Sequence, residues 1–273
     1  VNFVGNSNYA ITTNSIKSIT VENCTATNYS YGFLYANKST PTVVVKDVTV
    51  NGGNYGFHWV YGTTATLENV TMTNVTNGLY IQNYAGKTIN VKGCNISSIA
   101  IWERENESGV QTFNFTGENT VASLADSQYA KYVLAATDAT LTAPEGSTVI
   151  VTTELENQGY VVEYNEGVYS VVAGNVLNST TGKKYATLAA AINAASANDE
   201  LVLLNNITED VTISKSLTID GANFEYTGNI SVSGTSTKAT VKKVNFVDGT
   251  GYAITTNRIN TITVEDCTVA NYG

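Results

Sequence analysis

Residues 1–29 and residues 244–272 are two copies of one sequence. VNFVGNSNYAITTNSIKSITVENCTATNY and VNFVDGTGYAITTNRINTITVEDCTVANY are identical at 19 of 29 positions, and their alignment needs no gap. The copies are 243 residues apart, so the 273-residue chain holds one repeat unit and the start of the next. Self-similarity at a fixed period is typical of arrays in which each unit stacks on its neighbours. We therefore expect the chain to be part of a longer tandem array.

A shorter period runs inside this unit. An apolar–x–apolar triplet is followed by a charged residue, then by Asn, Asp or Gly, and then by a second apolar–x–apolar triplet. The pattern recurs every 22–24 residues, at 19–26, 43–50, 65–72 and 89–96, with weaker copies around Gly117, Gly221 and Lys243. Short strands at this period predict a β-solenoid, an all-β fold whose coils stack at about 4.8 Å.

In such a fold the side chains form columns that run from coil to coil. The turn column holds mostly Asn, Asp and Gly, which tolerate a left-handed backbone: Gly221, Lys243, Asn23, Asp47, Asn69, Gly93 and Gly117. The outward column beside it alternates in sign, with Glu265 equivalent to Glu22. We call it the charge ladder: Asp220, Lys242, Glu265, Glu22, Lys46, Glu68 and Lys92. Because opposite charges on adjacent strands favour one register, we expect this ladder to fix register more than to add stability.

The cysteines are not expected to form disulfide bonds in the predicted fold. Cys24 and Cys94 share one inward column but lie three coils apart, which is about 14 Å at the strand spacing of a sheet. A disulfide needs a Cα separation of about 4.4–6.8 Å. Cys267 is the repeat copy of Cys24. All three are therefore expected to be apolar fillers of the core.

The coil pattern fades after about Val121. Three strands, 147–153, 159–164 and 168–172, are expected to close the solenoid, with a hairpin turn at 165–167. A single short helix is expected over 185–197, where Leu188, Ile192 and Ala195 have helical spacing. It would cap the open end of the coils that follow. Residues 1–173 are thus the later part of one unit, and residues 174–273 are the start of the next.

The segment GKKYATLAAAINAASANDELVLLNNITEDVTISKSLTIDGAN, residues 182–223, resembles the N-terminal cap and first coils of pectin-lyase-like domains. The resemblance extends over the coils as well, which is most of the chain apart from residues 121–173. It implies a right-handed parallel β-helix, and it implies tandem units in adhesin-like surface proteins of bacteria or archaea. Fold alone does not fix function, so the chemistry has to be judged from the residues.

We expect no enzymatic activity and no cofactor. The sequence has no Asp-Asp pair, His-Gly or Arg-x-Lys, the motifs that related polygalacturonases carry, and Arg258 is replaced by Ser15 in the other copy. Glu103, Arg104, Glu105 and Glu107 form the densest charge cluster, which lacks calcium-loop spacing and is expected to be a solvated loop. His58 is the single histidine, so no second imidazole is there to share a metal.

One outward column is a candidate ligand or partner face. It is expected to hold Leu34, His58, Tyr80 and Trp102 on successive coils, with Tyr31, Tyr55 and Tyr61 near the adjoining turns. Exposed aromatic strips mark contacts with proteins or sugars. The alternative is that the strip packs under a loop, such as residues 121–145.

The functional expectation is a structural or adhesive tandem repeat of a long extracellular, cell-surface protein or filament. Neighbouring copies would be its partners, end to end, together with glycans or host and cell-surface proteins. The net charge of −9 argues against nucleic acid and anionic membranes as partners, and no apolar stretch predicts membrane insertion. The alternative function is a carbohydrate-binding or polysaccharide-degrading β-helix.

Overall fold

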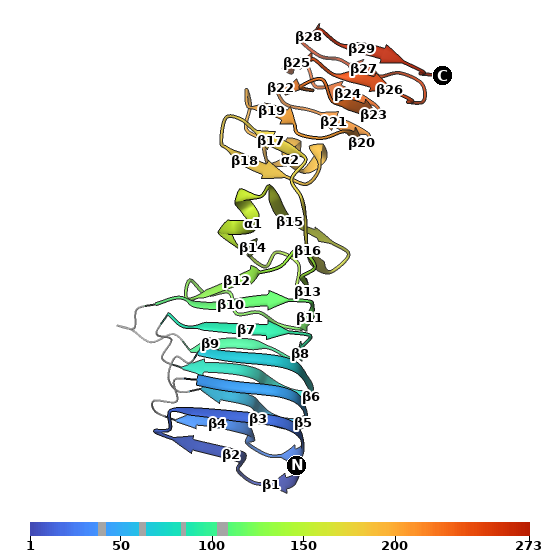
Figure 1. Ribbon diagram of the computed structural model, residues 1–273. Coiled ribbons are helices and arrows are strands. Elements are labelled where there is room, and N and C mark those ends of the chain that lie inside the picture. Colours follow the sequence, from blue (N-terminus) through green and yellow to red (C-terminus); the bar gives the residue numbers. More distant parts are fainter. Residues whose placement is uncertain (38–41, 60–63, 83–85, 103–108) are drawn as a thin grey trace. The chain divides into compact units, whose positions relative to one another are not determined.

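The computed structural model describes residues 1–37, 42–59, 64–82, 86–102 and 109–273 (Figure 1). The fold is all-β, with 61% strand and 5% helix, and its strands form a β-solenoid of about 11 turns, as the sequence predicts. The chain divides into two compact units. The first comprises Val1–Gln158 and Val162–Val171, and the second comprises Gly159–Val161 and Val172–Gly273. The hand of the solenoid and the repeat-unit limits at 173 and 174 remain predictions.

Three columns of parallel strands build the first unit (Figure 1). The first column runs through β3 (Ser18–Tyr29), β5 (Thr42–Trp59), β6 (Thr64–Gln82), β7 (Thr88–Lys92), β10 (Gln111–Thr116), β12 (Ala130–Leu134) and β14 (Val149–Val151). The second starts at β1 (Asn2–Asn6), passes through the later parts of β3, β5 and β6, and continues in β8 (Asn95–Ile96), β11 (Glu118–Val121) and β13 (Thr140–Thr142). The third contains β2 (Tyr9–Asn14), β4 (Gly32–Asn37), the ends of β5 and β6, and β9 (Ile99–Trp102).

The register of the first two columns matches the predicted one. Val21, Val45, Leu67 and Val91 are paired in sequence, and so are Cys24, Val48 and Val70. Between these strands the chain turns at residues with positive φ, which include Asn23 (51°), Asp47 (51°), Asn69 (53°) and Lys243 (52°). Gly221 is the exception, because the left-handed residues there are Ala222 and Asn223. Gly221 is needed for space instead: a Cβ would lie 2.4 Å from the carbonyl oxygen of Lys243.

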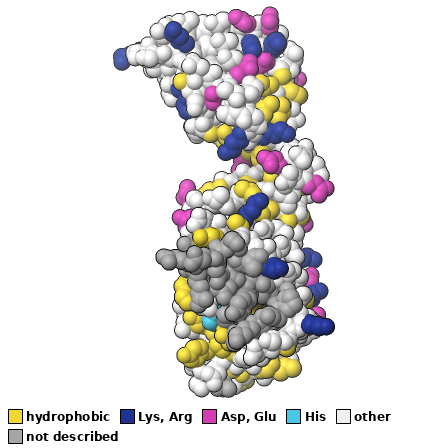
Figure 2. Space-filling view, turned by 90° about the vertical axis from the view of Figure 1, so that its left-hand side faces the viewer, with side chains coloured by type: hydrophobic (Ala, Val, Ile, Leu, Met, Phe, Trp, Pro, Cys, Tyr) yellow, Lys and Arg dark blue, Asp and Glu magenta, His cyan; other side chains and the backbone are white. Residues whose placement is uncertain are grey.

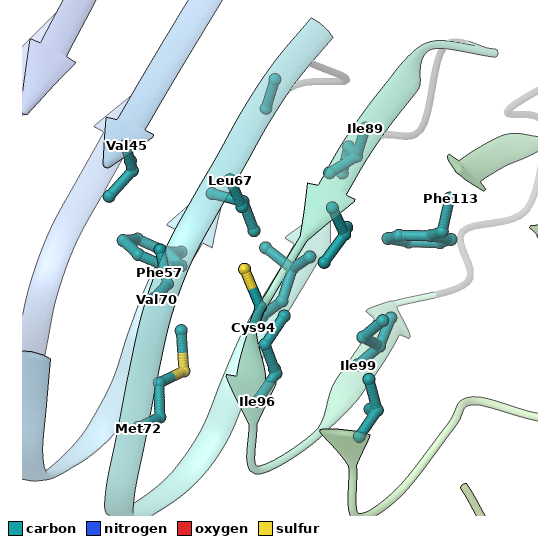
Figure 3. Close-up of a cluster of buried hydrophobic side chains, with 14 of the residues drawn as sticks. Val45, Phe57, Leu67, Val70, Met72, Ile89, Cys94, Ile96, Ile99 and Phe113 are labelled. Atoms are coloured by element: carbon teal, nitrogen blue, oxygen red, sulfur yellow. The ribbon is translucent and has the colours of Figure 1, made fainter. Parts of the chain in front are cut away.

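The inward columns form one apolar core within the first unit (Figure 3). Val45, Leu67, Val70, Ile89 and Ile96 are fully or almost fully buried, and each is stacked on side chains of the neighbouring coils. Cys24 and Cys94 are buried and free, and Cys267 is free and half-buried. Their prediction as core fillers without disulfides is therefore confirmed.

The end of the first unit differs from the prediction. Coils do not stop near Val121, because β12 pairs with β10 and β14 pairs with β12, both in parallel. These coils are shorter, with 19 residues from Phe113 to its partner Tyr132, and so they escape a search at a period of 22–24. β15 (Tyr160–Asn165) and β16 (Val168–Ala173) follow, and β16 pairs antiparallel with β13. Glu166 and Gly167 both have positive φ, which is the geometry of a tight hairpin turn.

A short helix that was not predicted, α1 (Thr153–Asn157), lies between β14 and β15. Its N-cap is Thr152, whose hydroxyl accepts a hydrogen bond from the Leu155 amide at 3.3 Å. Glu154 and Glu156 lie in its first turn, where carboxylates are favourable. Because Thr152 caps a helix, α1 begins at Thr153, the last residue of the segment 147–153 that was predicted to be a strand.

The second unit opens with a cap and then repeats the three-column plan. β17 (Val176–Asn178), β18 (Lys183–Tyr185) and α2 (Leu188–Ala194) precede the coils, which confirms a short helix within 185–197. Thr187 caps this helix, and the Glu209 carboxylate accepts hydrogen bonds from the Leu188 and Ala189 amides at 2.6 and 3.2 Å. The buried side chains of Leu188 and Ile192 join the core of this unit.

The coils of the second unit lie in three separate sheets. The first column consists of β19 (Glu200–Leu203), β22 (Leu217–Asp220), β25 (Lys238–Lys242) and β28 (Thr261–Glu265). The second consists of β20 (Ile207–Thr208), β23 (Glu225–Thr227), β26 (Asn245–Val247) and β29 (Thr268–Ala270). The third consists of β21 (Val211–Ile213), β24 (Ile230–Ser233) and β27 (Ile254–Asn257).

The two copies of the duplicated sequence fold in the same way. Asn2 pairs with Thr25 in the first copy, and their equivalents Asn245 and Thr268 pair in the second. The left-handed positions also agree: Gly5 and Asp248, Ser15 and Arg258, Asn23 and Asp266, and Asn28 and Asn271. Each unit therefore contains the same coil, made by the same residues.

Candidate functional site

The outer face of the third column in the first unit carries a cluster of aromatic side chains. We call it the aromatic cluster: Tyr9, Tyr31, Tyr35, Tyr55, His58 and Tyr80. Tyr35, His58 and Tyr80 are partners on successive coils, supplied by β4, β5 and β6. The single imidazole, cyan in Figure 2, is visible at the molecular surface.

His58 is the centre of this cluster. Its ring lies 4.8 Å from the ring of Tyr55, 4.9 Å from that of Tyr35 and 5.1 Å from that of Tyr80, measured between centroids. The hydroxyl of Tyr9 lies 2.6 Å from Nδ1 of His58. Rings from four coils therefore converge on one half-buried imidazole.

A glycine makes room for the approach of Tyr9. Tyr9, Gly32 and Tyr55 are successive partners in one outward column, so a side chain at position 32 would stand between the two tyrosines. A Cβ at Gly32 would lie 2.2 Å from the Tyr55 carbonyl oxygen. The rings of Tyr9 and Tyr35 are nearly parallel, and their centroids are only 5.0 Å apart. The backbone at this site thus admits only glycine.

Burial favours the neutral forms of two members of the cluster, His58 and Tyr9. Burial lowers the pKa of His58, and this outweighs the opposite effect of the Gln82 side chain. Burial, together with the neighbouring tyrosines, raises the pKa of Tyr9. The Tyr9 hydroxyl and Nδ1 of His58 share a hydrogen bond of 2.6 Å, and the tautomer of the imidazole decides which of them donates. The arrangement offers flat π-faces and hydroxyls, the combination that sugar rings and peptide side chains bind.

Two residues predicted for this face are elsewhere. Leu34 is fully buried in the core, and Tyr35 occupies its predicted place beside His58. Ala100 is the partner of Tyr80, while Trp102, 42% exposed, is paired with Gln82 two positions along. Tyr61 lies outside the described residues.

The turn before the third column explains both errors, because its length varies from coil to coil. Met72 is 24 residues before Ile96 in their shared column, whereas Leu79 is only 20 residues before its partner Ile99. A shift of one residue moves a side chain to the other face of a strand, which is the error made at Leu34. The contact between Tyr9 and His58 could not be predicted from a single column, because the two residues lie two coils apart.

The predicted charge ladder is in register throughout. Glu22 faces Lys46, Lys46 faces Glu68 and Glu68 faces Lys92, and in the second unit Lys242 lies between Asp220 and Glu265. Lys46 and Lys92 both reach Glu68, at 3.2 and 3.3 Å. Hydrogen bonds from these two lysines lower the pKa of Glu68.

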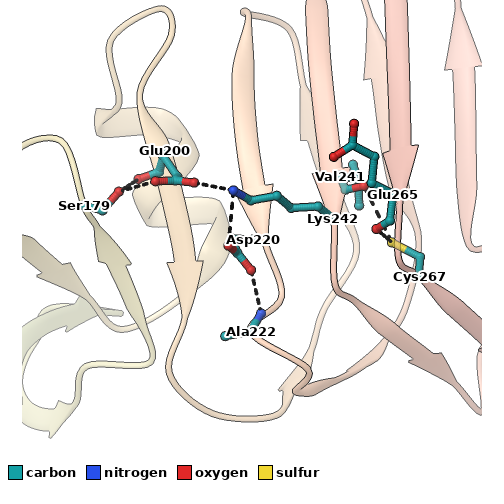
Figure 4. Close-up of polar contacts among 8 residues, drawn as sticks. All are labelled: Ser179, Glu200, Asp220, Ala222, Val241, Lys242, Glu265 and Cys267. Carbon is teal, nitrogen blue, oxygen red and sulfur yellow. Dashed lines mark hydrogen bonds and ion pairs between the residues drawn. The ribbon is translucent and has the colours of Figure 1, made fainter.

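In the second unit the ladder has one further member (Figure 4). Lys242 binds Asp220 at 3.3 Å and also Glu200 at 2.7 Å, and Glu200 accepts a hydrogen bond from the Ser179 hydroxyl. The hydrogen bond to Glu200 is the largest contribution that raises the pKa of Lys242. Glu200 was not predicted because it lies two coils from Lys242, beyond adjacent-strand pairing.

A ladder of small polar side chains follows the outer face of the second column. Thr25, Thr49, Thr71, Asn95, Thr120 and Thr142 are successive partners. The last four line a shallow groove together with Glu118 and Thr140. The "x" of the second apolar–x–apolar triplet encodes this ladder, although it was not singled out from the sequence.

Among the described residues, no group of three or more His, Cys, Asp and Glu side chains is placed to hold a metal ion. The cluster of Glu103, Arg104, Glu105 and Glu107 lies outside those residues. Within the same described ranges, no helix has the length and apolar character needed to cross a membrane.

No protein-family model matches the chain, and no curated protein or solved structure matches it either.

Proposed function

We propose that this chain is a non-catalytic structural repeat of an extracellular surface protein, in which 243-residue units continue one another and serve adhesion or display. The equivalence of the two copies carries this proposal. They share pairing register and left-handed positions, although one copy belongs to the first unit and the other to the second. A coil that is remade from the same residues supports a sequence repeated as a building block.

The outer surface supports the same role. The charge ladder repeats a pair of opposite charges, and the ladder of small polar side chains repeats threonine on most coils. Repetition of this kind suits the maintenance of register along a stack, whereas catalysis needs a few different groups converging on one point. The resemblance of residues 182–223 to caps of adhesin-like repeats favours a cell-surface location.

Electron microscopy of engineered arrays with one, two and three 243-residue units tests the proposal. We expect particle length to grow by a constant increment with each added unit, because every unit adds the same set of coils. Particles whose length does not increase regularly with unit number would contradict it.

The aromatic cluster supports a second function, recognition of a glycan by the face around His58. Its observation is the convergence of four tyrosines on one imidazole. Binding to a glycan array should be lost in Tyr9→Ala and Tyr80→Ala. Tyr252→Ala is the matched control, since Tyr252 is the copy of Tyr9 and is 76% exposed. Equal binding by all three variants would remove this second function.

A further inference from the structure

The chain contains a modification motif that the proposed function does not use, Asn-x-Ser/Thr. This sequon, with any residue except proline in the middle, is the acceptor of N-linked oligosaccharides in secreted proteins. It begins at eleven asparagines: Asn23, Asn28, Asn37, Asn69, Asn74, Asn95, Asn106, Asn114, Asn178, Asn206 and Asn229. A chain rich in Asn and Thr contains sequons by chance, so accessibility in the fold decides which of them matter.

Four of these asparagines lie at the turns on either side of the second column of the first unit. Asn23 and Asn69 come directly before the residues that pair in that column, and Asn28 and Asn74 come directly after them. All four are exposed, and their φ angles are 51°, 53°, 60° and 55° in that order. Asn69 and Asn74 belong to a coil with paired coils on both sides. These are surface turns of the kind that a bulky modification requires.

The coils in between carry residues without a carboxamide at the same turns. Asp47 lies between Asn23 and Asn69, and Gly52 occupies the middle position of the other turn. Two strand spacings, about 10 Å, therefore separate the two asparagines of one turn. Gly93 is next after Asn69, and it leaves room there, because a Cβ would lie 2.9 Å from Oδ1 of Asn69. Attached groups would thus alternate with bare turns.

Modification is compatible with the contacts that hold the internal pair of asparagines. Nδ2 of Asn69 donates a hydrogen bond to Oδ1 of Asp47 at 3.0 Å, and Nδ2 of Asn74 donates to Oδ1 of Asn51 at 3.0 Å. A primary amide has two hydrogens, and substitution by a sugar removes one of them. The remaining hydrogen is sufficient for each of these bonds.

Three other sequons have a structural role instead. Asn178 is 1% exposed, and its carboxamide donates to Asp199 and accepts from the amide of Thr180. Asn206 and Asn229 are likewise bonded through both Nδ2 and Oδ1. The remaining sequons lie in strands or extend beyond the described residues: Asn95, Asn114, Asn37 and Asn106.

The duplicated coil shows that the turns do not need the sequons of the first copy. Asp266 is the copy of Asn23, and Gly273 is the copy of Ser30, so both sequons are absent from the second copy. The left-handed turns are nevertheless kept, with φ of 51° at Asp266 and 57° at Asn271. The amide of Asn23 and the hydroxyl of Ser30 are therefore free for another use.

We propose that Asn23, Asn28, Asn69 and Asn74 are N-glycosylated, with a lipid-phosphate-linked oligosaccharide as the sugar donor. Nδ2 loses one hydrogen and forms a bond to the anomeric carbon of the first sugar. The bond from that carbon to the phosphate oxygen breaks, and the lipid phosphate leaves with the proton. The inference rests on the proposed extracellular role, since it requires export of the chain. The oligosaccharides would flank the ladder of small polar side chains and keep that face hydrated.

Mass spectrometry of glycopeptides tests the proposal on the full chain, exported from a host that has an N-glycosylation pathway. We expect oligosaccharides at the four turn asparagines and none at Asn178. Bare asparagine at all four turns of the exported chain, or equal occupancy at Asn178, would overturn the proposal. Neither result changes the particle lengths expected for arrays of one, two and three units, so the two proposals fail independently.

The second copy supplies the matched variants. Asn23→Asp and Ser30→Gly introduce the residues that the second copy carries, so the turns should form as before. Each variant should lose the mass of one oligosaccharide while its circular dichroism spectrum stays unchanged. A chain whose mass is the same with and without these substitutions, apart from the substituted residue, would contradict modification at Asn23 and Asn28.

Discussion

Replacing one buried valine and its neighbour on the last coil tests the solenoid packing. Val241 and Val264 are partners in one inward column of the second unit. Val241 is 0% exposed and lies between Ile219 and Val264, whereas Val264 is 50% exposed. The same substitution, valine to alanine, therefore probes a buried and a half-exposed position within one column.

The expected difference follows from the atoms removed. Valine to alanine deletes two methyl groups, worth about 1.6 kcal/mol when fully buried at about 0.8 kcal/mol each. A cavity between fixed strands adds to this loss, so Val241→Ala should lower the free energy of unfolding by about 2–3 kcal/mol. Val264 is already half in water and leaves no enclosed cavity, so Val264→Ala should lower it by less than about 1 kcal/mol.

Urea unfolding followed by far-ultraviolet circular dichroism measures both losses. Trp59 and Trp102, the two tryptophans, both belong to the first unit, so their fluorescence supplies an internal reference for that unit. Equal losses for the two variants would contradict the difference in burial between the two valines, and the packing described above would then be wrong.

Three further substitutions probe the turns, the charge ladder and the aromatic cluster. Lys243→Gly should stabilise the chain by about 0.5–1 kcal/mol in urea unfolding, because a left-handed backbone strains lysine but not glycine; a loss of stability would contradict this. Glu68→Lys should lower the melting temperature through repulsion by two lysines, and added salt should restore part of the loss; a salt-independent loss would refute this origin. Burial lowers the pKa of His58 in the folded state, so its contribution to stability is complete above about pH 6.5 and is lost as the pH falls through the folded pKa. His58→Gln should therefore reduce the dependence of the melting temperature on pH below about pH 6.5. An unchanged pH profile would contradict this.

The sequence predicted the parts of the fold that repeat in register. The columns through Val45, Leu67 and Val91 and the alternation of Lys46, Glu68 and Lys92 could be read directly, because these residues recur at 22–24 and always on the same face. Periodicity alone is sufficient where every coil has the same length.

The parts that failed are those where coil length changes. The short coil through Tyr132 and the shifts at Leu34 and Trp102 follow turns of altered length, whereas the helix α1 follows from capping by Thr152. The aromatic cluster was predicted only in part, since the contact between Tyr9 and His58 depends on how side chains from different coils lean over a glycine. Such contacts depend on the direction in which each side chain points, and the spacing of residues in the sequence does not give that direction.

The central claim is that both copies of the duplicated sequence form the same coil, and paired cysteines test it most directly. In a chain without its native cysteines, Asn2→Cys with Thr25→Cys and Asn245→Cys with Thr268→Cys should each form an intramolecular disulfide, because both pairs are strand partners at about 4.8 Å. Pairs displaced by two residues, such as Asn245→Cys with Ala270→Cys, should form none. Crosslinking in only one copy, or at the displaced positions in either, would contradict the claim.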